Sequence, residues 1–500
     1  MFILKRFRRF PLNPVYRNFS SSIKTFSEEL SNPVRTTFGQ PTPWTHPHVC
    51  KPNEVARGFT VSEFQDRRQR LLNAIEKYAV DTKISFKNHL IVIPSSTKKY
   101  MSDKIPYVFR QNSDFFYLTG CLEPDSILLL TIDENHSMKS LLFMRPKDKH
   151  AELWDGPRTG TENSIDYFGV DEAHDVGKFQ EFIQSKKLEL PPTNPVLLWY
   201  DESQSDQELG TILSKLVAFP GQLQSPTRFI HNLRLIKSPS EIEMMRKTCQ
   251  VASLCINETM RETKPGDSEH HIFARVDYKC RMRDASILAY PPVVASGTNA
   301  TTIHYIANTQ LTKPGDMVLM DAGCEFGGYS SDITRTWPVS GDFNPHQRVL
   351  YEVVSTLQQD LINMLQKPKV GQSLDQLFET MCLLLGKYLQ EVGLISKSIT
   401  GVALAREGYK FCPHHVSHYL GMDVHDTPSV SRSIKLIPGM VCTVEPGIYI
   451  SEDRMDVPEE FRGLGIRIED DILIKENGEV ENLTQQCVKD KSELVKLLSS

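Results

Sequence analysis

The sequence predicts a protein of the mixed α/β (α+β) class, with an N-terminal α/β domain followed by a C-terminal domain built from two related halves. Three observations carry this prediction. Helical and β-like patterns alternate from Val61 to about Pro226, a strong helix start follows at Ser238, and beyond it two short segments resemble each other around an acidic residue. At 500 residues, with 40% hydrophobic and 24% charged side chains, the chain can bury the cores of two globular domains.

The N-terminal α/β domain is expected over residues 58–230. Apolar side chains recur at helical spacing over residues 63–78. Short apolar runs bounded by turn residues are typical of strands, and they lie at 90–93, 126–130, 141–144 and 196–200. Alternating helices and strands commonly form a sheet with helices packed on its faces. None of these segments contains a cluster of residues suited to bind a metal.

The C-terminal domain is expected over residues 231–500. Its first helix begins at Ser238, because Ser at the N-cap, Pro239 at the first helical position and Glu241 at the third form a capping box. Further on, residues 350–365 and 374–389 have the spacing of amphipathic helices. We expect these helices to cover the outer face of a sheet.

Two segments of the C-terminal half have the same construction. The Pro-Gly pair at 314–315 is followed by Asp321 and the pair at 438–439 by Glu445, and each acid stands six residues after its glycine. A short apolar run precedes each acid, and another glycine comes two residues after it. This similarity predicts an internal duplication in which each copy presents an acid at the end of a strand.

Each copy contains a second acid downstream. Asp332 stands eleven residues after the first acid, and Glu469 stands twenty-four residues after the second. Alternation along a strand places Arg467 and Asp471 on the same face as Glu469, so Arg467 is a candidate partner for the carboxylates. Alone, either segment is typical of a surface strand with an ion pair. Beside the repeated Pro-Gly segments, they predict four carboxylates that face one another.

Such carboxylates raise one another's pKa and need a cation to balance their charge. Four of them are too many for a typical zinc site, but they suit two divalent ions held about 3.5–4 Å apart by bridging acids. His418 is the candidate for a single nitrogen ligand. The candidate metal ligands are therefore Asp321, Asp332, His418, Glu445 and Glu469.

Residues 413–426 contain the richest group of histidines. His414 and His418 are four residues apart, as in the zincin motif, but His415 occupies the position where that motif requires Glu. The zincin interpretation is therefore rejected. An isolated histidine is more often a satisfied core residue than a catalytic one, so the pattern leaves the roles of His414 and His415 open.

Charge and cysteine content exclude several classes of protein. The formal net charge of −5 gives no reason to expect nucleic acid or an anionic membrane as a partner. No stretch approaches the ~20 apolar residues that span a bilayer. Ten cysteines without a C-x-x-C motif predict a reducing compartment and buried thiols rather than disulfides.

Residues 1–19 have the composition of a mitochondrial transit peptide. The first 27 residues contain six basic side chains and no acidic one, and Pro11 and Pro14 interrupt the apolar run that a secretory signal needs. A merely basic tail is the alternative. We expect cleavage before Ser20 and a location in the mitochondrial matrix, and a cytosolic location for an alternative product synthesised without these residues. Residues 20–57, rich in Pro, Thr and His, are expected to form an extended arm.

Nearly the whole chain beyond the transit peptide resembles the creatinase/prolidase/methionine aminopeptidase family, whose catalytic domain has a pseudo-symmetric pita-bread fold. The similarity is greatest to its aminopeptidase P (Xaa-Pro aminopeptidase) branch, mitochondrial type. In the C-terminal half it lies in HYIAN (304–308), MDAGCEFGGYSSDITRTWPV (320–339), PHHVSHYLGMDVHD (413–426), TVEPGIYI (443–450) and GLGIRIEDD (463–471). In the N-terminal half it lies in QPTPWTHPH (40–48), RQNSDFFYLTG (110–120) and ELWDGPRTG (152–160).

The resemblance implies a metalloaminopeptidase that releases the N-terminal residue from peptides with proline in second position. Asp321 would bind one metal ion, His418 and Glu445 the other, and Asp332 and Glu469 would bridge them. A hydroxide held between two Mn²⁺-like ions would attack the carbonyl before proline, while Glu445 moves the proton to the leaving nitrogen. The cofactor expected is thus a pair of divalent ions, with Mn²⁺ ahead of Co²⁺ and Zn²⁺.

The resemblance also assigns roles outside the metal ligands. His304 and His425 would contact the substrate and steady the developing oxyanion. In this family the N-terminal domain partly closes the active site of a neighbouring subunit, so a homo-oligomer, dimer or tetramer, is expected. The candidates for shaping substrate access or supporting the ligands are Arg467, Asp114, Trp154 and His415.

Two other functions stay open at this point. Prolidase uses the same chemistry but is restricted to Xaa-Pro dipeptides, and some relatives with this fold have lost ligands and serve as binding modules for proteins. Creatinase uses the fold without metal. The filled ligand positions argue against both metal-free alternatives, and the RQNSDFFYLTG segment favours the aminopeptidase over prolidase.

Overall fold

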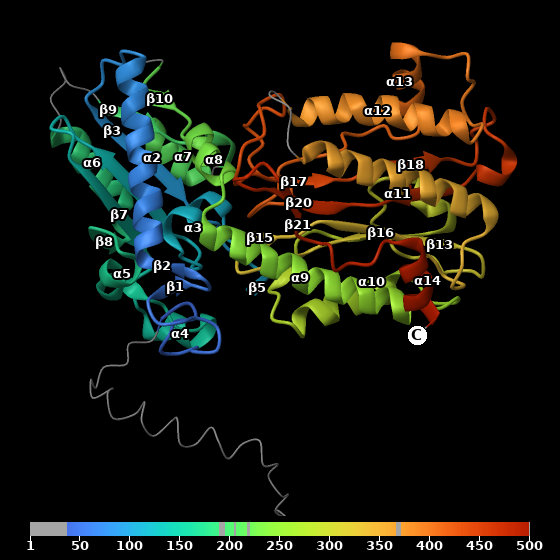
Figure 1. The fold of residues 1–500 in the computed structure, drawn as a ribbon. Helices are drawn as coiled ribbons and strands as arrows, with labels where there is room; N and C mark the ends of the chain where they lie inside the picture. Colours follow the sequence, from blue (N-terminus) through green and yellow to red (C-terminus); the bar gives the residue numbers. More distant parts are fainter. Residues whose placement is uncertain (1–37, 190–195, 205–206, 218–220, 367–371, 500) are drawn as a thin grey trace, which may run out of the picture.

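The computed structural model describes residues 38–189, 196–204, 207–217, 221–366 and 372–499. Two domains lie side by side, one around a six-stranded sheet and the other around shorter strands enclosed by helices (Figure 1). The fold is thus of the mixed class that the sequence predicted. The expected transit peptide, 1–19, and residues 20–37 of the expected arm lie outside the described residues.

The N-terminal domain is built on a mixed sheet with the strand order β10-β9-β3-β6-β7-β8. β3 lies inside it, parallel to β9 and antiparallel to β6, which explains why its side chains are mostly buried. All four strands predicted in this half belong to the sheet. Its strands are β3 (Asn88–Pro94), β6 (Ile127–Ile132), β7 (Met138–Met144), β8 (Glu172–Asp175), β9 (Val196–Trp199) and β10 (Leu223–Gln224). Two small pairs lie outside it, β1 (Glu54–Ala56) with β2 (Phe59–Thr60) and β4 (Tyr100–Ser102) with β5 (Ile105–Pro106).

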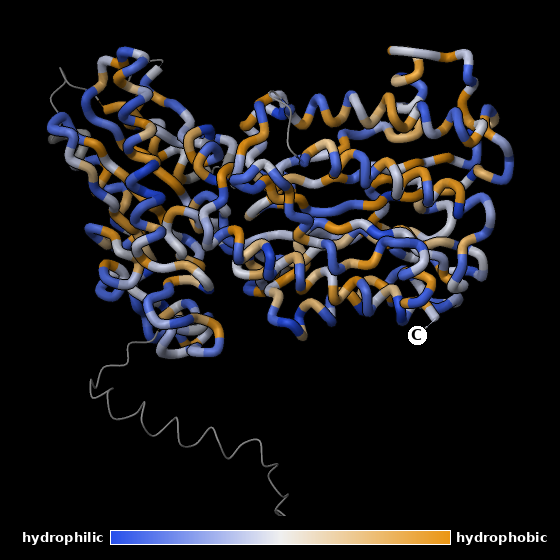
Figure 2. Tube along the Cα trace, viewed as in Figure 1, coloured by the Kyte–Doolittle hydropathy of each residue, from blue (hydrophilic) through white to orange (hydrophobic). Residues whose placement is uncertain are grey.

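Helices cover this sheet, and the longest is α2 (Val61–Asp81), which contains the predicted helix 63–78. Hydrophobic and hydrophilic residues alternate along it, as an amphipathic helix requires (Figure 2). Its buried Arg68 donates a hydrogen bond of 2.9 Å to the carbonyl oxygen of Leu118 at the end of α3. The other helices are α3 (Ser113–Thr119), α4 (Lys149–Asp155), α5 (Gly160–Phe168), α6 (Phe179–Glu189), α7 (Gln207–Ser214) and α8 (Thr227–Leu235).

The C-terminal domain begins with the predicted capping box. The Ser238 hydroxyl accepts a hydrogen bond from the Glu241 N–H, and the Glu241 carboxylate accepts one from the Ser238 N–H at 2.9 Å. The helix that follows is α9 (Pro239–Glu262). It lies with α10 (Glu269–Arg281) on one face of the strands, and α11 (Pro345–Leu365) and α12 (Leu374–Glu391) lie on the other (Figure 1). Both predicted amphipathic helices are confirmed, and α13 (Gly401–Tyr409) and α14 (Lys491–Ser499) complete the domain.

The strand pairing shows the predicted internal duplication. In each copy the strand that leads to the first acid pairs antiparallel with the strand after the second acid, β13 with β16 and β17 with β20; Asp321 is the next-to-last residue of β13, and Glu445 directly follows β17. Between them each copy has a further antiparallel pair, β14 with β15 and β18 with β19. The first copy consists of β13 (Met317–Ala322), β14 (Cys324–Phe326), β15 (Tyr329–Ser330) and β16 (Ile333–Pro338). The second consists of β17 (Val441–Val444), β18 (Gly447–Ile450), β19 (Leu464–Arg467) and β20 (Asp470–Ile474). Strands β11 (Ile287–Leu288), β12 (Val293–Ser296) and β21 (Val480–Asn482) extend these sheets.

The prediction that Asp332 and Glu469 lie inside continuous strands is wrong. Asp332 lies between β15 and β16, and Glu469 lies between β19 and β20. At each place the chain leaves one partner strand and pairs with another, so the ladder is interrupted at the acid. The alternation of side chains along a strand shows on which face each residue lies. It does not show where the strand changes its hydrogen-bonded partner strand.

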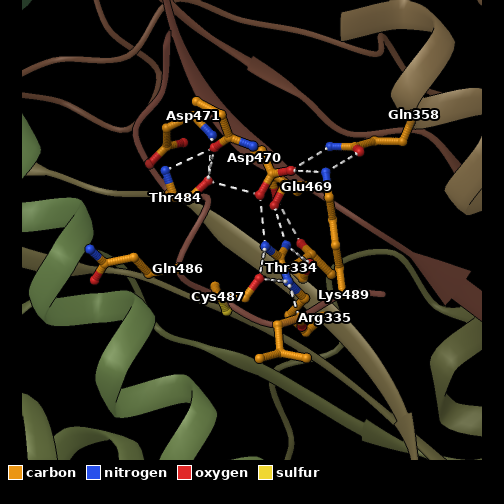
Figure 3. Close-up of polar contacts among 12 residues, drawn as sticks. Thr334, Arg335, Gln358, Glu469, Asp470, Asp471, Thr484, Gln486, Cys487 and Lys489 are labelled. Atoms are coloured by element: carbon orange, nitrogen blue, oxygen red, sulfur yellow. Dashed lines mark hydrogen bonds and ion pairs between the residues drawn. The ribbon is translucent and has the colours of Figure 1, made fainter. Parts of the chain in front are cut away.

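A buried ion pair joins the two copies beside these breaks. Arg335 of β16 donates through Nη2 to Asp470 Oδ1 of β20 at 2.7 Å, and Lys489 contacts the other carboxylate oxygen (Figure 3). Gln358 and Thr484 donate to the same carboxylate, each at 2.8 Å. Burial acts to raise the pKa of Asp470, but the charges of Arg335 and Lys489 outweigh it and lower that pKa. The Asp470 carboxylate is therefore ionised, and both of its oxygens have hydrogen-bond partners.

All ten cysteines are buried, as the sequence predicted, and their thiols are free. Within the described ranges, the structure contains no helix both long enough and apolar enough to cross a membrane.

Replacing Arg335 with Met should destabilise the fold, because it leaves the Asp470 carboxylate buried without its main partner. The expected loss is about 3–5 kcal/mol, visible in calorimetry as a lower thermal midpoint. The control is Arg348→Met, since Arg348 is 45% exposed and pairs with the exposed Asp342, and its midpoint should hardly change. Equal midpoints for the two variants would show that the pair does not hold the copies together.

Candidate metal centre

Four carboxylates and one imidazole meet where the two copies face each other. Asp321 lies near the end of β13 and Asp332 directly before β16. Glu445 directly follows β17 and Glu469 directly precedes β20. His418 lies on the segment between α13 and β17. Since both copies contribute two acids from corresponding places, the duplication itself brings the four carboxylates together.

Close approach of the backbone explains the glycine that follows each first acid. A Cβ atom on Gly323 would lie 1.8 Å from the carbonyl oxygen of Ser331. A Cβ atom on Gly447 would lie 2.9 Å from the carbonyl oxygen of Ile466. Glycine at 323 therefore lets the segment before Asp332 pass directly beside the end of β13.

The imidazole of His418 is oriented by its own segment. Its Nδ1 lies 3.1 Å from the carbonyl oxygen of Tyr419, which assigns the hydrogen to Nδ1. Its Nε2 then faces the acids, 3.4 Å from Asp332 Oδ2 and 3.5 Å from Glu445 Oε1. A hydrogen-bonded Nδ1 with a free Nε2 is the arrangement that metal-binding histidines adopt.

The electrostatics of the site call for cations. Burial and the charge of Asp321 raise the pKa of Asp332 well above its usual range. Burial and the charge of Asp332 do the same to the pKa of Glu469. Burial also raises the pKa of Glu445, against the partial compensation of His418. Ionising all of these carboxylates together is costly unless positive charge is present.

The donor set fits hard or borderline divalent ions. Ligand atoms of Asp332, His418 and Glu469 all lie within 4.8 Å of one another. Glu469 accepts a hydrogen bond of 2.6 Å from Thr334 through Oε2, while its buried Oε1 has no hydrogen-bond partner among the described residues. A buried carboxylate oxygen without a partner, aimed at other acids, is suited to bind a cation.

Arg467, the candidate partner named from the sequence, contacts the site. Its Nη2 lies 2.7 Å from Asp321 Oδ2, and its Nε donates to Thr334 Oγ1 at 3.0 Å. Thr334 in turn donates to Glu469. One buried guanidinium thus supports an acid of each copy.

Tyr290 is a site residue that the sequence analysis missed. Its hydroxyl lies 2.5 Å from Asp332 Oδ1 and also contacts Asp321 Oδ1. Burial and the charge of Asp321 raise its pKa well above the usual range, so it stays a hydrogen-bond donor. In the sequence it stands before Pro291 and Pro292, without a neighbouring acid, histidine or glycine. A tyrosine before two prolines gave no signal specific enough to find it.

The two histidines expected to contact substrate lie at the exposed side of the site. The rings of His425 and His418 are 4.5 Å apart between centroids. Burial, His418, Arg432 and His304 lower the pKa of His425 to about 4, so His304 lies within electrostatic reach of it. The side chains of His304 and His425 both reach solvent.

The histidines that the sequence left open differ in their contacts. His414 Nε2 lies 3.0 Å from the hydroxyl of Tyr449, which accepts a hydrogen bond of 2.8 Å from Arg467. His414 is therefore linked to the carboxylates through Tyr449 and Arg467. His415 instead stacks on Phe378, with centroids 4.9 Å apart.

The remaining candidates, Asp114 and Trp154, do not contact the five candidate ligand residues in the described structure. Asp114 is buried and pairs with Arg234 at 2.6 Å. Trp154 is 78% exposed on α4.

The fold and this acidic centre define a metallopeptidase, and residues 243–476 match the model of metallopeptidase family M24. Residues 64–189 match the aminopeptidase P, N-terminal domain. The chain is 43% identical over 470 residues to Xaa-Pro aminopeptidase 3 of Homo sapiens, covering 92% of this chain and 90% of that one. It is 36% identical over 465 residues to the mitochondrial intermediate cleaving peptidase 55 of Arabidopsis thaliana, covering 92% and 88%.

Among solved structures, proline aminopeptidase P II from Yersinia pestis superposes with a TM-score of 0.77 at 33% identity, covering 88% of this chain and all of that one (100%). This chain therefore belongs to the aminopeptidase P (Xaa-Pro aminopeptidase) family of metallopeptidases, which are hydrolases of peptides with an N-terminal Xaa-Pro sequence.

The raised pKa values predict that the metal-free protein loses stability as pH rises. Its folded carboxylates bind protons more tightly than the unfolded ones, whose pKa is about 4, so ionising them costs stability above that pH. Calorimetry with a chelator should show the thermal midpoint falling from pH 5 to pH 8, and less steeply in Asp332→Asn. Added Mn²⁺ should raise the midpoint more at pH 8 than at pH 6.

The matched control is Asp342→Asn, since the Asp342 side chain is 62% exposed. Its midpoint should follow the wild type at every pH. Identical pH slopes for the wild type and Asp332→Asn would contradict the assigned repulsion between buried carboxylates.

Proposed function

We propose that this chain is a metal-dependent Xaa-Pro aminopeptidase with a dinuclear centre. The observation that supports this proposal is the convergence of four carboxylates and one imidazole at a single, mostly buried site. Asp321 would ligate one ion, His418 and Glu445 the other, and Asp332 and Glu469 both. When bound, divalent ions lower the pKa of coordinated water and polarise the substrate carbonyl.

Mn²⁺ is the ion we propose for this site. Four oxygen donors with one nitrogen donor suit an ion harder than Zn²⁺ in its ligand preference. Co²⁺ and Zn²⁺ can occupy similar sites, so metal availability also decides which ion is bound.

Glu445 is the group we propose as the proton carrier. Its side chain is 15% exposed, so it is reachable from the substrate side, whereas Glu469 is fully buried. Burial raises the pKa of Glu445, which makes it a better base than an exposed glutamate. It would take a proton from the attacking water and pass it to the leaving nitrogen.

His304 and His425 would bind the substrate and the developing oxyanion. With a pKa lowered to about 4, His425 is neutral at pH 7 and retains one ring N–H as a donor. A neutral donor placed beside the metal ligands can stabilise negative charge on the carbonyl oxygen without repelling the cations.

The chemistry of the scissile bond explains why a dedicated enzyme is needed. The Xaa-Pro bond is a tertiary amide without N–H, so peptidases that bind this hydrogen cannot use it. The relatives named Xaa-Pro aminopeptidase support cleavage of longer peptides over the dipeptide restriction of prolidase.

A mitochondrial matrix location is the one we propose. It is supported by the basic, acid-free N-terminal composition and by a relative named as mitochondrial. An alternative product synthesised without residues 1–19 would stay in the cytosol.

The activity is tested with matched peptides Xaa-Pro-Yaa, Xaa-Pro and Xaa-Ala-Yaa, using metal-stripped protein with and without Mn²⁺. Only Xaa-Pro-Yaa should be cleaved efficiently, and only with metal. Asp332→Asn and Glu469→Gln should lower kcat/KM at least about 1,000-fold, since each removes a bridging charge.

Glu243→Gln is the control for that assay, because the Glu243 side chain is 77% exposed on α9 and its loss should leave the rate unchanged. Cleavage confined to the dipeptide would indicate prolidase. Absence of cleavage with every metal would indicate a binding protein on a catalytic fold.

We also propose a homo-oligomer, dimer or tetramer, in which the N-terminal domain of one subunit faces the active site of another. Apolar side chains on the β4–β5 hairpin and on α4 support it, with exposed fractions from 53% for Ile105 to 80% for Leu153. An ion pair of 3.2 Å between Lys98 and Asp155 joins the hairpin to α4, so the two apolar groups are neighbours. A contiguous exposed apolar patch is typical of a protein interface.

Leu153→Glu should lower the molar mass measured by light scattering, because a charge would then be buried at the interface. The matched control is Val402→Glu on α13, where Val402 is 71% exposed in the other domain, and it should keep the mass of the wild type. A wild type that is monomeric at the concentrations of the activity assay would rule out the proposed oligomer.

A further inference from the structure

His425 lies on a segment, residues 421–429, that contains no helix or strand. Charged side chains fix this segment from outside. Asp423 and Asp426, which lie on either side of His425, both bind the guanidinium of Arg234. The position of His425 therefore depends on an arginine that belongs to another part of the fold.

Arg234 lies on α8, the helix that leads from the N-terminal domain into α9, and it is 3% exposed. Its Nη2 lies 2.6 Å from Asp423 Oδ2 and also contacts Asp426 Oδ1. Its Nη1 lies 2.6 Å from Asp114 Oδ1. Lys237 adds a contact of 3.1 Å to Asp426 Oδ2. Buried charges of both signs are thus paired with good geometry, as a stable buried network requires.

The N-terminal domain takes part in this network through residues beside and within α3. Arg110 Nη2 lies 3.0 Å from Asp423 Oδ1, and Ser113 donates to the same oxygen at 2.6 Å. Asp114, the next residue, binds Arg234. Two residues of the N-terminal domain therefore contact Asp423, and a third, Asp114, binds the arginine that holds Asp423 and Asp426.

The backbone of the segment is strained and must be held in place. Thr427 has φ 50°, a left-handed conformation that is unfavourable for a β-branched residue. Such strain persists where the surroundings over-determine the conformation. Here the contacts of Asp426 lie on one side of Thr427, and a 2.7 Å hydrogen bond between Ser429 and His231 of α8 lies on the other.

We propose that Arg234 is a positioning residue for His425. By binding both Asp423 and Asp426, it fixes the segment so that the imidazole of His425 stays beside His418, while Asp114 links the same guanidinium to the N-terminal domain. The inference rests on the proposed function, in which His425 stabilises the transition state. A displacement of about 1 Å at such a group can lower the rate about 100-fold.

A double-mutant cycle with full-length Mn²⁺-loaded enzyme tests this. Arg234→Met should lower kcat for Xaa-Pro-Yaa roughly 10- to 100-fold with KM changed much less. In a His425→Ala background, the same substitution should lower kcat no more than about twofold, because the group that it positions is absent. Should Arg234→Met fail to fold, Asp423→Asn, whose side chain is 32% exposed in the wild type, takes its place in the cycle.

The matched control is Arg67→Met. Arg67 is also 3% exposed and lies between the domains, where it contacts Glu63 at 2.9 Å and Glu241 at 3.7 Å, remote in sequence from the His425 segment. It should lower the thermal midpoint but leave kcat of the folded enzyme nearly unchanged. Equal losses of kcat from Arg234→Met with and without His425 would overturn the inference alone. A wild type without Xaa-Pro hydrolysis would overturn the proposed function and this inference with it.

Discussion

The mutual repulsion of buried carboxylates is the constraint on which the rest of this structure depends. The pKa values of Asp332 and Glu469 are raised by burial and by like charge, so the chain itself opposes the arrangement. Hydrogen bonds from Tyr290 and Thr334 and one guanidinium, Arg467, reduce that repulsion without balancing it. Without metal, contacts in other parts of the fold must hold these acids together against their repulsion.

The internal duplication supplies that resistance. Because the two copies face each other, each needs to present only two acids, and the second acid of each copy lies where the chain changes its partner strand. The breaks would be weak points, since the backbone ladder is interrupted there. The buried pair of Arg335 and Asp470 crosses between the copies beside both breaks, and Arg335 also donates to the Glu469 carbonyl oxygen at 2.5 Å. This buried ion pair therefore links the two copies at the places where the backbone hydrogen bonds between paired strands are interrupted.

The sequence could predict those parts of the site whose residue pattern lies within one short segment of the chain. Asp321 and Glu445 were named as candidate ligands because a Pro-Gly pair and a glycine recur at fixed offsets around them. Asp332 and Glu469 were named as the further acid of each copy, and His418 came from the histidine-rich segment 413–426. The helices were found from caps and apolar spacing. Tyr290 and Arg234 were missed because their partners lie elsewhere in the chain and their neighbours carry no pattern. Asp114 was predicted to shape substrate access, but it forms a buried ion pair with Arg234. That pair depends on how the two domains pack, which the spacing of residues along the sequence does not reveal.

In the run Glu469-Asp470-Asp471, the surroundings of each carboxylate decide the direction in which its pKa is shifted. Three successive acids, all buried, have pKa values shifted in different directions. Asp470 faces Arg335 and Lys489, and its pKa is lowered. Glu469 and Asp471 both face Asp332, and their pKa values are raised by burial and by its charge. Because successive side chains of an extended chain point to opposite sides, one short run contributes both to the candidate metal centre and to the ion pair beside it.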